Sequence, residues 1–224
     1  MKLFELLIKI QNNSANIKRK LTGVKDGEDF EKSLIQELTN EGSYHYYSAK
    51  DFKKHKNFRV IKKLLLEKSS GAKRIKFDGF KDLILGGDVV IYQPFGSQSF
   101  PDIILINSQY VIPFETKFSN KDGDRPTWNS NLPHDEGIYI FGSRMKSDIS
   151  FFNGMDLLPT DIKEKLVELV VQKSEELYKE GLKITTEFSL YLREMYNQKS
   201  SVLKSKNRKL YEDNVIELLK ELEE

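Results

Sequence analysis

The middle of the chain alternates short apolar runs with turn-forming residues. Its clearest unit is residues 100–118, in which the apolar runs Ile103–Ile106 and Tyr110–Phe114 flank a short polar connection. Both runs are rich in β-branched and aromatic residues, a pattern typical of a β-hairpin. Further strands are predicted at residues 73–77, 88–92 and 137–142.

Helical periodicity dominates both ends of the chain. Apolar residues recur every three or four positions in the predicted helices, which are residues 2–11, 27–41, 160–180 and 210–223. The strongest of these, residues 160–180, has an apolar stripe formed by Leu166, Leu169, Val170 and Leu177. We predict a loop for the polar residues 12–27, and residues 184–196 favour neither helix nor strand.

The hairpin sets the register of three polar residues. A four-residue connection over residues 107–110 places Asp102 opposite Glu115, counting outward from the turn. Strand alternation then puts Lys117 on the same face as Glu115. Two carboxylates about 5 Å apart repel each other unless a proton or a cation lies between them.

These three residues suit metal-dependent hydrolysis of a phosphodiester. Two carboxylates supply the oxygen ligands that Mg²⁺ prefers, and the bound ion stabilises charge on phosphate and acidifies a bound water. A neighbouring ammonium can orient that water or stabilise the developing charge. The alternative interpretation is a cross-strand salt bridge at the surface.

The same residues resemble a known nuclease signature. Pro101-Asp102 followed by Glu115-Thr116-Lys117 is similar to the motif of the PD-(D/E)XK nuclease superfamily, which includes most type II restriction endonucleases. The resemblance implies an α/β (α+β) restriction-endonuclease-like fold, with a central mixed β-sheet flanked by helices. It also implies Asp102 and Glu115 as Mg²⁺ ligands, Lys117 as the catalytic lysine and the Thr116 carbonyl as a candidate further ligand.

Two other acids are candidates for the same site. Glu31 borders the apolar stripe of the helix at 27–41, where it resembles the accessory glutamate of many members of this superfamily. A solvated helix acid is the alternative for Glu31. Asp88 begins a predicted strand beside the Gly86-Gly87 turn, where an acid is more often structural.

Residues 119–136 follow Lys117 as a long polar segment, which we predict as a loop that contacts substrate. Arg and Asn side chains read guanine and adenine edges, so this segment is a candidate for base recognition. The alternative is that its tryptophan packs the loop down and its amides cap turns. The candidate DNA-binding residues in and near the segment are Arg125, Trp128, Asn129, Asn131, His134, Lys121, Arg144 and Lys146.

Composition narrows the class of protein. The chain has 224 residues, no cysteine and a formal net charge of +2. Disulfides, thiol catalysis and Cys-type zinc sites are therefore excluded, and any DNA contact must come from local basic clusters. Two such clusters are residues 44–63 and 198–209, for which an amphipathic helix and a mobile loop are the respective alternatives. No apolar run approaches the roughly 18 residues of a membrane span, so we expect a cytoplasmic protein without a membrane partner.

These observations predict one catalytic domain over residues 1–224, with a helical C-terminal part from about residue 160. The expected function is Mg²⁺-dependent, sequence-specific cleavage of double-stranded DNA. We expect a homodimer, because a palindromic site matches a two-fold axis. Another nuclease of the same fold, such as a repair enzyme or junction resolvase, and a non-catalytic binding domain are the alternatives.

Overall fold

The predicted hairpin forms the centre of a β-sheet. In the computed structural model of the chain, Ile106 pairs with Val111, which is the register expected from a four-residue connection. Asn107 closes the turn, since its side-chain oxygen accepts hydrogen bonds from the main-chain N–H groups of Gln109 and Tyr110.

The structure describes residues 1–40, 43–67, 75–76, 87–97, 99–107, 109–121, 123–129, 132–190 and 195–223. Its helices are α1 (Leu3–Gln11), α2 (Ala15–Thr22), α3 (Gly27–Asn40), α4 (Ala49–Phe52), α5 (Phe58–Glu67), α6 (Gly154–Leu157), α7 (Thr160–Ile184) and α8 (Arg208–Glu223). Its strands are β1 (Tyr44–Tyr46), β2 (Ile75–Lys76), β3 (Asp88–Tyr92), β4 (Ile103–Ile106), β5 (Tyr110–Ser119), β6 (Thr127–Asn129), β7 (Ile138–Ser143), β8 (Asp148–Asn153) and β9 (Met195–Asn197).

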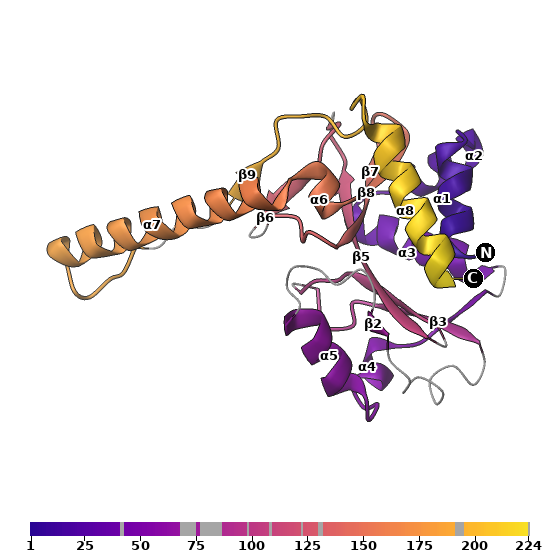
Figure 1. Cartoon of the computed structure of the whole chain (residues 1–224), viewed down its shortest axis with the longest axis horizontal. Helices are drawn as coiled ribbons and strands as arrows, with labels where there is room; N and C mark the ends of the chain where they lie inside the picture. The colour runs from indigo at the N-terminus through magenta and orange to yellow at the C-terminus, as the bar shows by residue number, and fades with distance from the viewer. Residues whose placement is uncertain are drawn as a thin grey trace.

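The main sheet is mixed, with the strand order β1-β3-β4-β5-β7-β8 and the short β2 paired to β5 (Figure 1). β1 is parallel to β3 and β5 is parallel to β7, whereas the other neighbours along this order are antiparallel. The prediction of an α/β chain with a central mixed sheet flanked by helices is therefore confirmed. A separate small sheet pairs β6 with β9.

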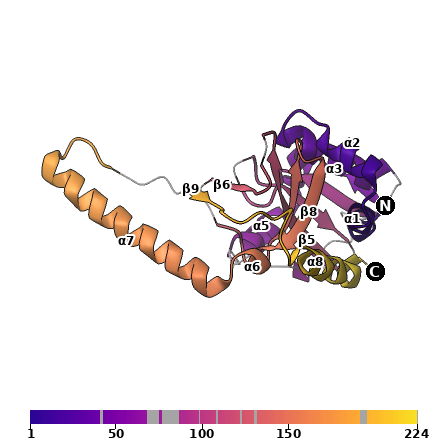
Figure 2. The same cartoon turned by 90° about the horizontal axis from the view of Figure 1, so that it is seen from above.

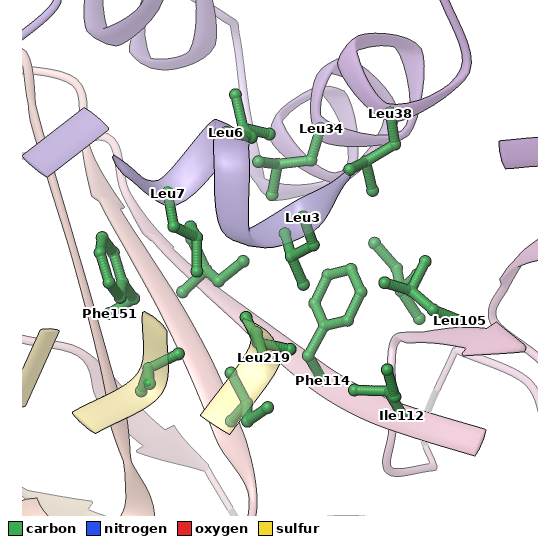
Figure 3. Packing of buried hydrophobic residues seen from close by; sticks show 14 of the residues in the cluster. Leu3, Leu6, Leu7, Leu34, Leu38, Leu105, Ile112, Phe114, Phe151 and Leu219 are labelled. Carbon is green, nitrogen blue, oxygen red and sulfur yellow. The ribbon is translucent and has the colours of Figure 1, made fainter. Parts of the chain in front are cut away.

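Helices cover both faces of the central strands. On one face α1, α3 and α8 pack their leucines against β4, β5 and β8, as Figure 3 shows. On the other face α4 and α5 cover a second cluster that includes Ile104, Ile106 and Val111. Because both faces are buried, β4 is a continuous apolar run instead of an alternating one.

Aromatic packing fixes α3 against β5. The rings of Phe30 on α3 and Phe118 on β5 are stacked with their centroids 5.0 Å apart. Gly142 of β7 lies against both rings, and a Cβ atom at this position would come within 2.8 Å of the Phe30 ring. The close approach of these three residues determines how near α3 can come to the strand that carries Glu115.

Several predictions of elements were wrong. Residues 15–22 form α2, because Leu21 and Thr22 can be buried on one side of this short polar helix. Residues 44–63 hold β1, α4 and most of α5 in place of one helix. β8 was not predicted, although its Ile149 and Phe151 belong to the main core. Of the strand predicted at 73–77, only β2 falls within the described residues.

The strongest predicted helix is correct in position but its packing was not foreseen. α7 extends to Ile184, and Figures 1 and 2 show it as an arm that projects from the rest of the molecule. Its predicted stripe includes Leu166 and Leu169, which are exposed. In the described part of the chain, no helix combines the length and the apolar character needed to cross a bilayer.

We predict that Gly142→Ala lowers the free energy of unfolding by about 1–3 kcal/mol, because the added methyl group must displace the buried Phe30 ring. Urea denaturation measures the effect. Gly27→Ala is the matched control, because a Cβ atom at Gly27 meets only the Phe118 Cβ at an ordinary 3.8 Å. Equal losses in the two variants would contradict the proposed close packing at Gly142.

Candidate active site

Two carboxyl groups meet where β4 begins beside β5. Asp102 directly precedes β4, and its main-chain N–H donates to Glu115 Oε2 over 3.1 Å. The Thr116 N–H in turn donates to Asp102 Oδ2 over 2.8 Å. The predicted placement of Asp102 beside Glu115 is therefore what the structure contains, and it follows from the register of the hairpin.

Lys117 lies on the same face of β5 as Glu115. Its Nζ atom is 2.9 Å from Glu115 Oε1, so the ion pair lies within one strand and differs from the cross-strand surface bridge of the alternative interpretation. Across the parallel pairing with β7, Glu115 and Lys117 lie next to Tyr139 and Phe141. Both side chains are partly buried, with 15% of Glu115 and 25% of Lys117 exposed.

Glu31 reaches the site from α3. Its Oε1 atom lies 3.0 Å from the hydroxyl oxygen of Thr116, which is also 3.1 Å from Asp102 Oδ2. The second carboxyl oxygen of Glu31 is buried and has no hydrogen-bond partner among the described residues. Glu31 is therefore not a solvated helix acid, and it contacts the same Thr116 hydroxyl as Asp102.

The Thr116 hydroxyl lies between two carboxyl groups. A threonine hydroxyl carries one hydrogen, so it can donate to Glu31 or to Asp102 but not to both. A proton on one of the two carboxyl groups, or a cation that reduces their repulsion, would favour the other contact. Thr116 was predicted to contribute its carbonyl oxygen, and sequence reasoning did not foresee this role of its side chain.

The electrostatics of the site favour proton or cation uptake. Burial raises the pKa of Glu115 to about 7, with a further increase from the Asp102 charge that the Lys117 ammonium partly offsets. Burial also raises the pKa of Asp102, against the opposing effects of Thr116 and Lys117. The pKa of Glu31 is raised by burial and by the Asp102 charge. Among the residues that the structure describes, these three acids thus share the Lys117 ammonium.

A divalent cation is compatible with these residues. Within the described ranges, no three His, Cys, Asp or Glu side chains are already arranged as a metal-binding group. Mg²⁺ often uses only one or two carboxylates and keeps several waters, so Asp102 and Glu115 are sufficient as protein ligands. The raised pKa values and the unpartnered Glu31 oxygen indicate a site that lacks positive charge.

Asp88 does not join this cluster. It lies at the opposite end of β3 from Tyr92, and Tyr92 is the residue that pairs with Ile103 next to Asp102. Asp88 forms an ion pair with Lys2 near the N-terminus. Its structural interpretation is therefore confirmed. Tyr92 and Gln93, which the sequence did not single out, are near Glu31 instead and act to lower its pKa.

Trp128 supports the lysine and does not face solvent. Its ring lies 5.6 Å from Lys117 Nζ, close enough for a cation–π contact. The indole is 4% exposed, meets Tyr139 edge-on, and donates from Nε1 to Gln198 Oε1 over 3.0 Å. The packing alternative for Trp128 is correct, and its prediction as a DNA-contacting residue is not supported by this burial.

The rest of the segment predicted as a loop includes a strand. Residues Thr127–Asn129 form β6 and pair with β9. Arg125 donates to the Lys199 carbonyl oxygen over 2.5 Å, and the neighbouring Asp124 carbonyl accepts from the Val202 N–H. The basic segment 198–209 is therefore held against this region and is not a free arm. Of the predicted residues here, Asn131 lies outside the described residues and Asn129 is described only in its main chain.

The remaining basic candidates lie beyond the acids, at the carboxyl ends of β5 and β7. Lys121 and Arg144 are exposed, and the Arg144 N–H donates to the Ser119 carbonyl oxygen. Lys146 is exposed in the same β7–β8 turn as Arg144. The His134 ring lies 4.3 Å from that of Phe100, close to Asp102 in sequence.

No protein-family model matches the chain, and none of the curated proteins or solved structures matches it. The chemistry of this site must therefore be judged from its own residues.

We predict that Glu115 makes the metal-free protein less stable as the pH rises. Its folded pKa of about 7 exceeds the ordinary 4.5, so its stabilising effect is complete below pH 4.5 and is lost as the pH rises through 7. The loss amounts to about 3 kcal/mol at most. Glu115→Gln should flatten this dependence in denaturant unfolding between pH 5 and 8, whereas the exposed-site control Glu164→Gln should not. Parallel curves for wild type and Glu115→Gln would contradict the raised pKa.

Proposed function

We propose that the chain is a Mg²⁺-dependent endonuclease acting on double-stranded DNA, with a restriction-endonuclease-like fold and a sequence-specific activity of the type II class. The observation that carries the proposal is the contact of Asp102, Glu115 and Lys117 at one strand junction, with Glu31 behind them. This arrangement has the three groups that the PD-(D/E)XK resemblance requires.

Each residue has a chemical role in this proposal. Asp102 and Glu115 hold the metal, which when bound supplies positive charge beside the scissile phosphate. Lys117 contacts Glu115 and can orient the attacking water or stabilise negative charge as it develops. Glu31 accepts from Thr116 and adds a third carboxyl group to the cluster. Trp128 keeps the Lys117 ammonium beside Glu115.

Double-stranded DNA suits the surroundings of the site. Lys121 and Arg144 are exposed just beyond Lys117 along the sheet, where they can reach phosphates on either side of the cut. With a net charge of only +2, the chain depends on such local basic groups for binding. We also propose base recognition for the segment 119–136, which leaves the strand that carries Lys117 and in which Arg125 is exposed.

We predict that Lys117→Ala abolishes cleavage of supercoiled plasmid in Mg²⁺ while leaving DNA binding intact. The ammonium touches Glu115 and no described residue depends on it for a main-chain hydrogen bond. Lys209→Ala is the control, because this lysine is 79% exposed on α8. Cleavage by Lys117→Ala at the wild-type rate would refute the assignment.

The same plasmid assay separates the alternatives for the wild-type protein. Discrete fragments support a sequence-specific endonuclease. Preference for a four-way junction over linear duplex would indicate a resolvase. Binding without cleavage, with Mg²⁺ present, would indicate a non-catalytic DNA-binding domain.

We predict that Lys121→Ala/Arg144→Ala weakens binding to any duplex and reduces its salt dependence. Each lost phosphate contact should lower the slope of log K against log salt by about 0.9. Fluorescence anisotropy at several salt concentrations measures the slope. Lys165→Ala/Lys183→Ala removes the same charge from exposed positions on α7 and should leave the slope unchanged. An equal change in both double variants would show that overall charge, and not this part of the sheet, governs binding.

A further inference from the structure

The arm formed by α7 is anchored to the body of the molecule near its base. The Thr160 hydroxyl donates to Asp135 Oδ2 and Lys163 Nζ lies 2.9 Å from Asp135 Oδ1. Beyond this point the helix extends away from the sheets in both views of the molecule (Figures 1 and 2). Of its residues, only Gly181 is buried.

Apolar side chains collect on this arm. Fifteen large hydrophobic side chains are exposed in the described part of the chain, and ten of them lie between residues 162 and 190. Monomeric soluble proteins rarely leave so much apolar surface together, and such surfaces commonly mark an interface. The arm therefore lacks a partner in the isolated chain.

Four of these side chains form one stripe. Val167, Val171, Tyr178 and Leu182 are each between 40% and 48% exposed. At about 100° per residue, their positions fall within an arc of about 60° on the helix. The chain that returns after α7 lies on a different side, because Leu190 is placed against Gly181, outside this arc. The described part of the returning chain, residues 185–190, therefore leaves the stripe exposed.

The four residues of the stripe have the same spacing whether the helix is followed from its N-terminus or from its C-terminus. The intervals between the four residues are four, seven and four positions, so reversing the helix reproduces the pattern. Two antiparallel copies related by a two-fold axis between residues 174 and 175 place Val167 opposite Leu182 and Val171 opposite Tyr178. A two-fold interface requires this kind of self-complementary patch.

Charges beside the stripe favour the same pairing. Glu168 and Lys179 lie on one flank of the stripe, and in the antiparallel arrangement each is about 3 Å along the axis from alignment with the other in the opposite copy. DNA is a poor occupant, because residues 160–190 contain seven acids and five lysines and no arginine.

We propose that Val167, Val171, Tyr178 and Leu182 form a homodimer interface, in which the α7 arms of two copies pack antiparallel. The interface is a property of the arm and does not depend on whether the chain cleaves DNA. It assigns the two-fold axis to a place well separated from Asp102 and Glu115.

Light scattering after size exclusion tests the proposal on the full chain without DNA. The wild type should be a dimer at micromolar concentration and Val171→Lys a monomer. Gln172→Lys introduces the same charge at an adjacent exposed position outside the stripe and should stay dimeric. Circular dichroism should show equal helix content in all three. A monomeric wild type, or a dimer that survives Val171→Lys, would overturn the proposal.

Cysteine cross-linking tests the register. The chain has no cysteine, so the background is zero. Val171→Cys/Tyr178→Cys should form a covalent dimer under mild oxidation, while each single variant should not, because like positions lie about 10 Å apart along the axis. Efficient cross-linking of either single variant would instead show a parallel pairing and refute the antiparallel one. Because neither experiment measures cleavage, an inactive protein that dimerises in this way overturns only the proposed function.

Discussion

Repulsion among three buried carboxyl groups is the constraint around which the site is built. Glu31 comes from α3, Asp102 directly precedes β4 and Glu115 lies on β5, and the Thr116 hydroxyl and the Lys117 ammonium contact these acids. Burial raises the pKa of each acid. Such a cluster stabilises a fold poorly by itself, since buried charge must be neutralised by a proton, a paired group or a metal ion. Its arrangement is compatible with the cation site that we propose.

The surrounding fold holds these acids in place with apolar contacts. The β4-β5 register fixes Asp102 relative to Glu115, and the stacking of Phe30 on Phe118 holds α3 close enough for Glu31 to reach Thr116. Neither the strand register nor the aromatic stacking involves a charged group. The free energy that opposes carboxylate repulsion is therefore provided by the core that Figure 3 shows, on the face of the sheet behind the site.

Local patterns in the sequence were sufficient to predict the central hairpin of the structure, but they did not predict the contacts around it. Strand alternation and turn length predicted that Asp102, Glu115 and Lys117 lie close together. The prediction succeeded because the strands of a hairpin are close in sequence and their register is set by the turn. Thr116 and Trp128 were harder to interpret, because their contacts come from Glu31, Tyr139 and Gln198, which are distant in sequence.

The helix at 160–184 shows a different limit of prediction from sequence. Periodicity identified it correctly, but an apolar stripe predicts only that a face needs a partner and not whether the partner belongs to the same chain. Similarly, the polar composition of residues 15–22 concealed α2, in which three buried residues, Lys18, Leu21 and Thr22, are enough to hold a short helix against the core. Tertiary contacts override local propensity in such segments.

The path of the chain through the arm allows the length of α7 to change without disturbing the acids. The chain leaves the main sheet after β8, passes through α7, returns as β9 beside β6, and rejoins the core as α8. The arm is thus an excursion that begins and ends near Trp128, and its far end touches none of the core clusters. Insertion or deletion of one helical turn in α7, matched in the returning segment, would change its reach by about 5.4 Å and leave the acids undisturbed. In a dimer joined through the arms, the length of α7 would then set the distance between the two copies of this acidic site.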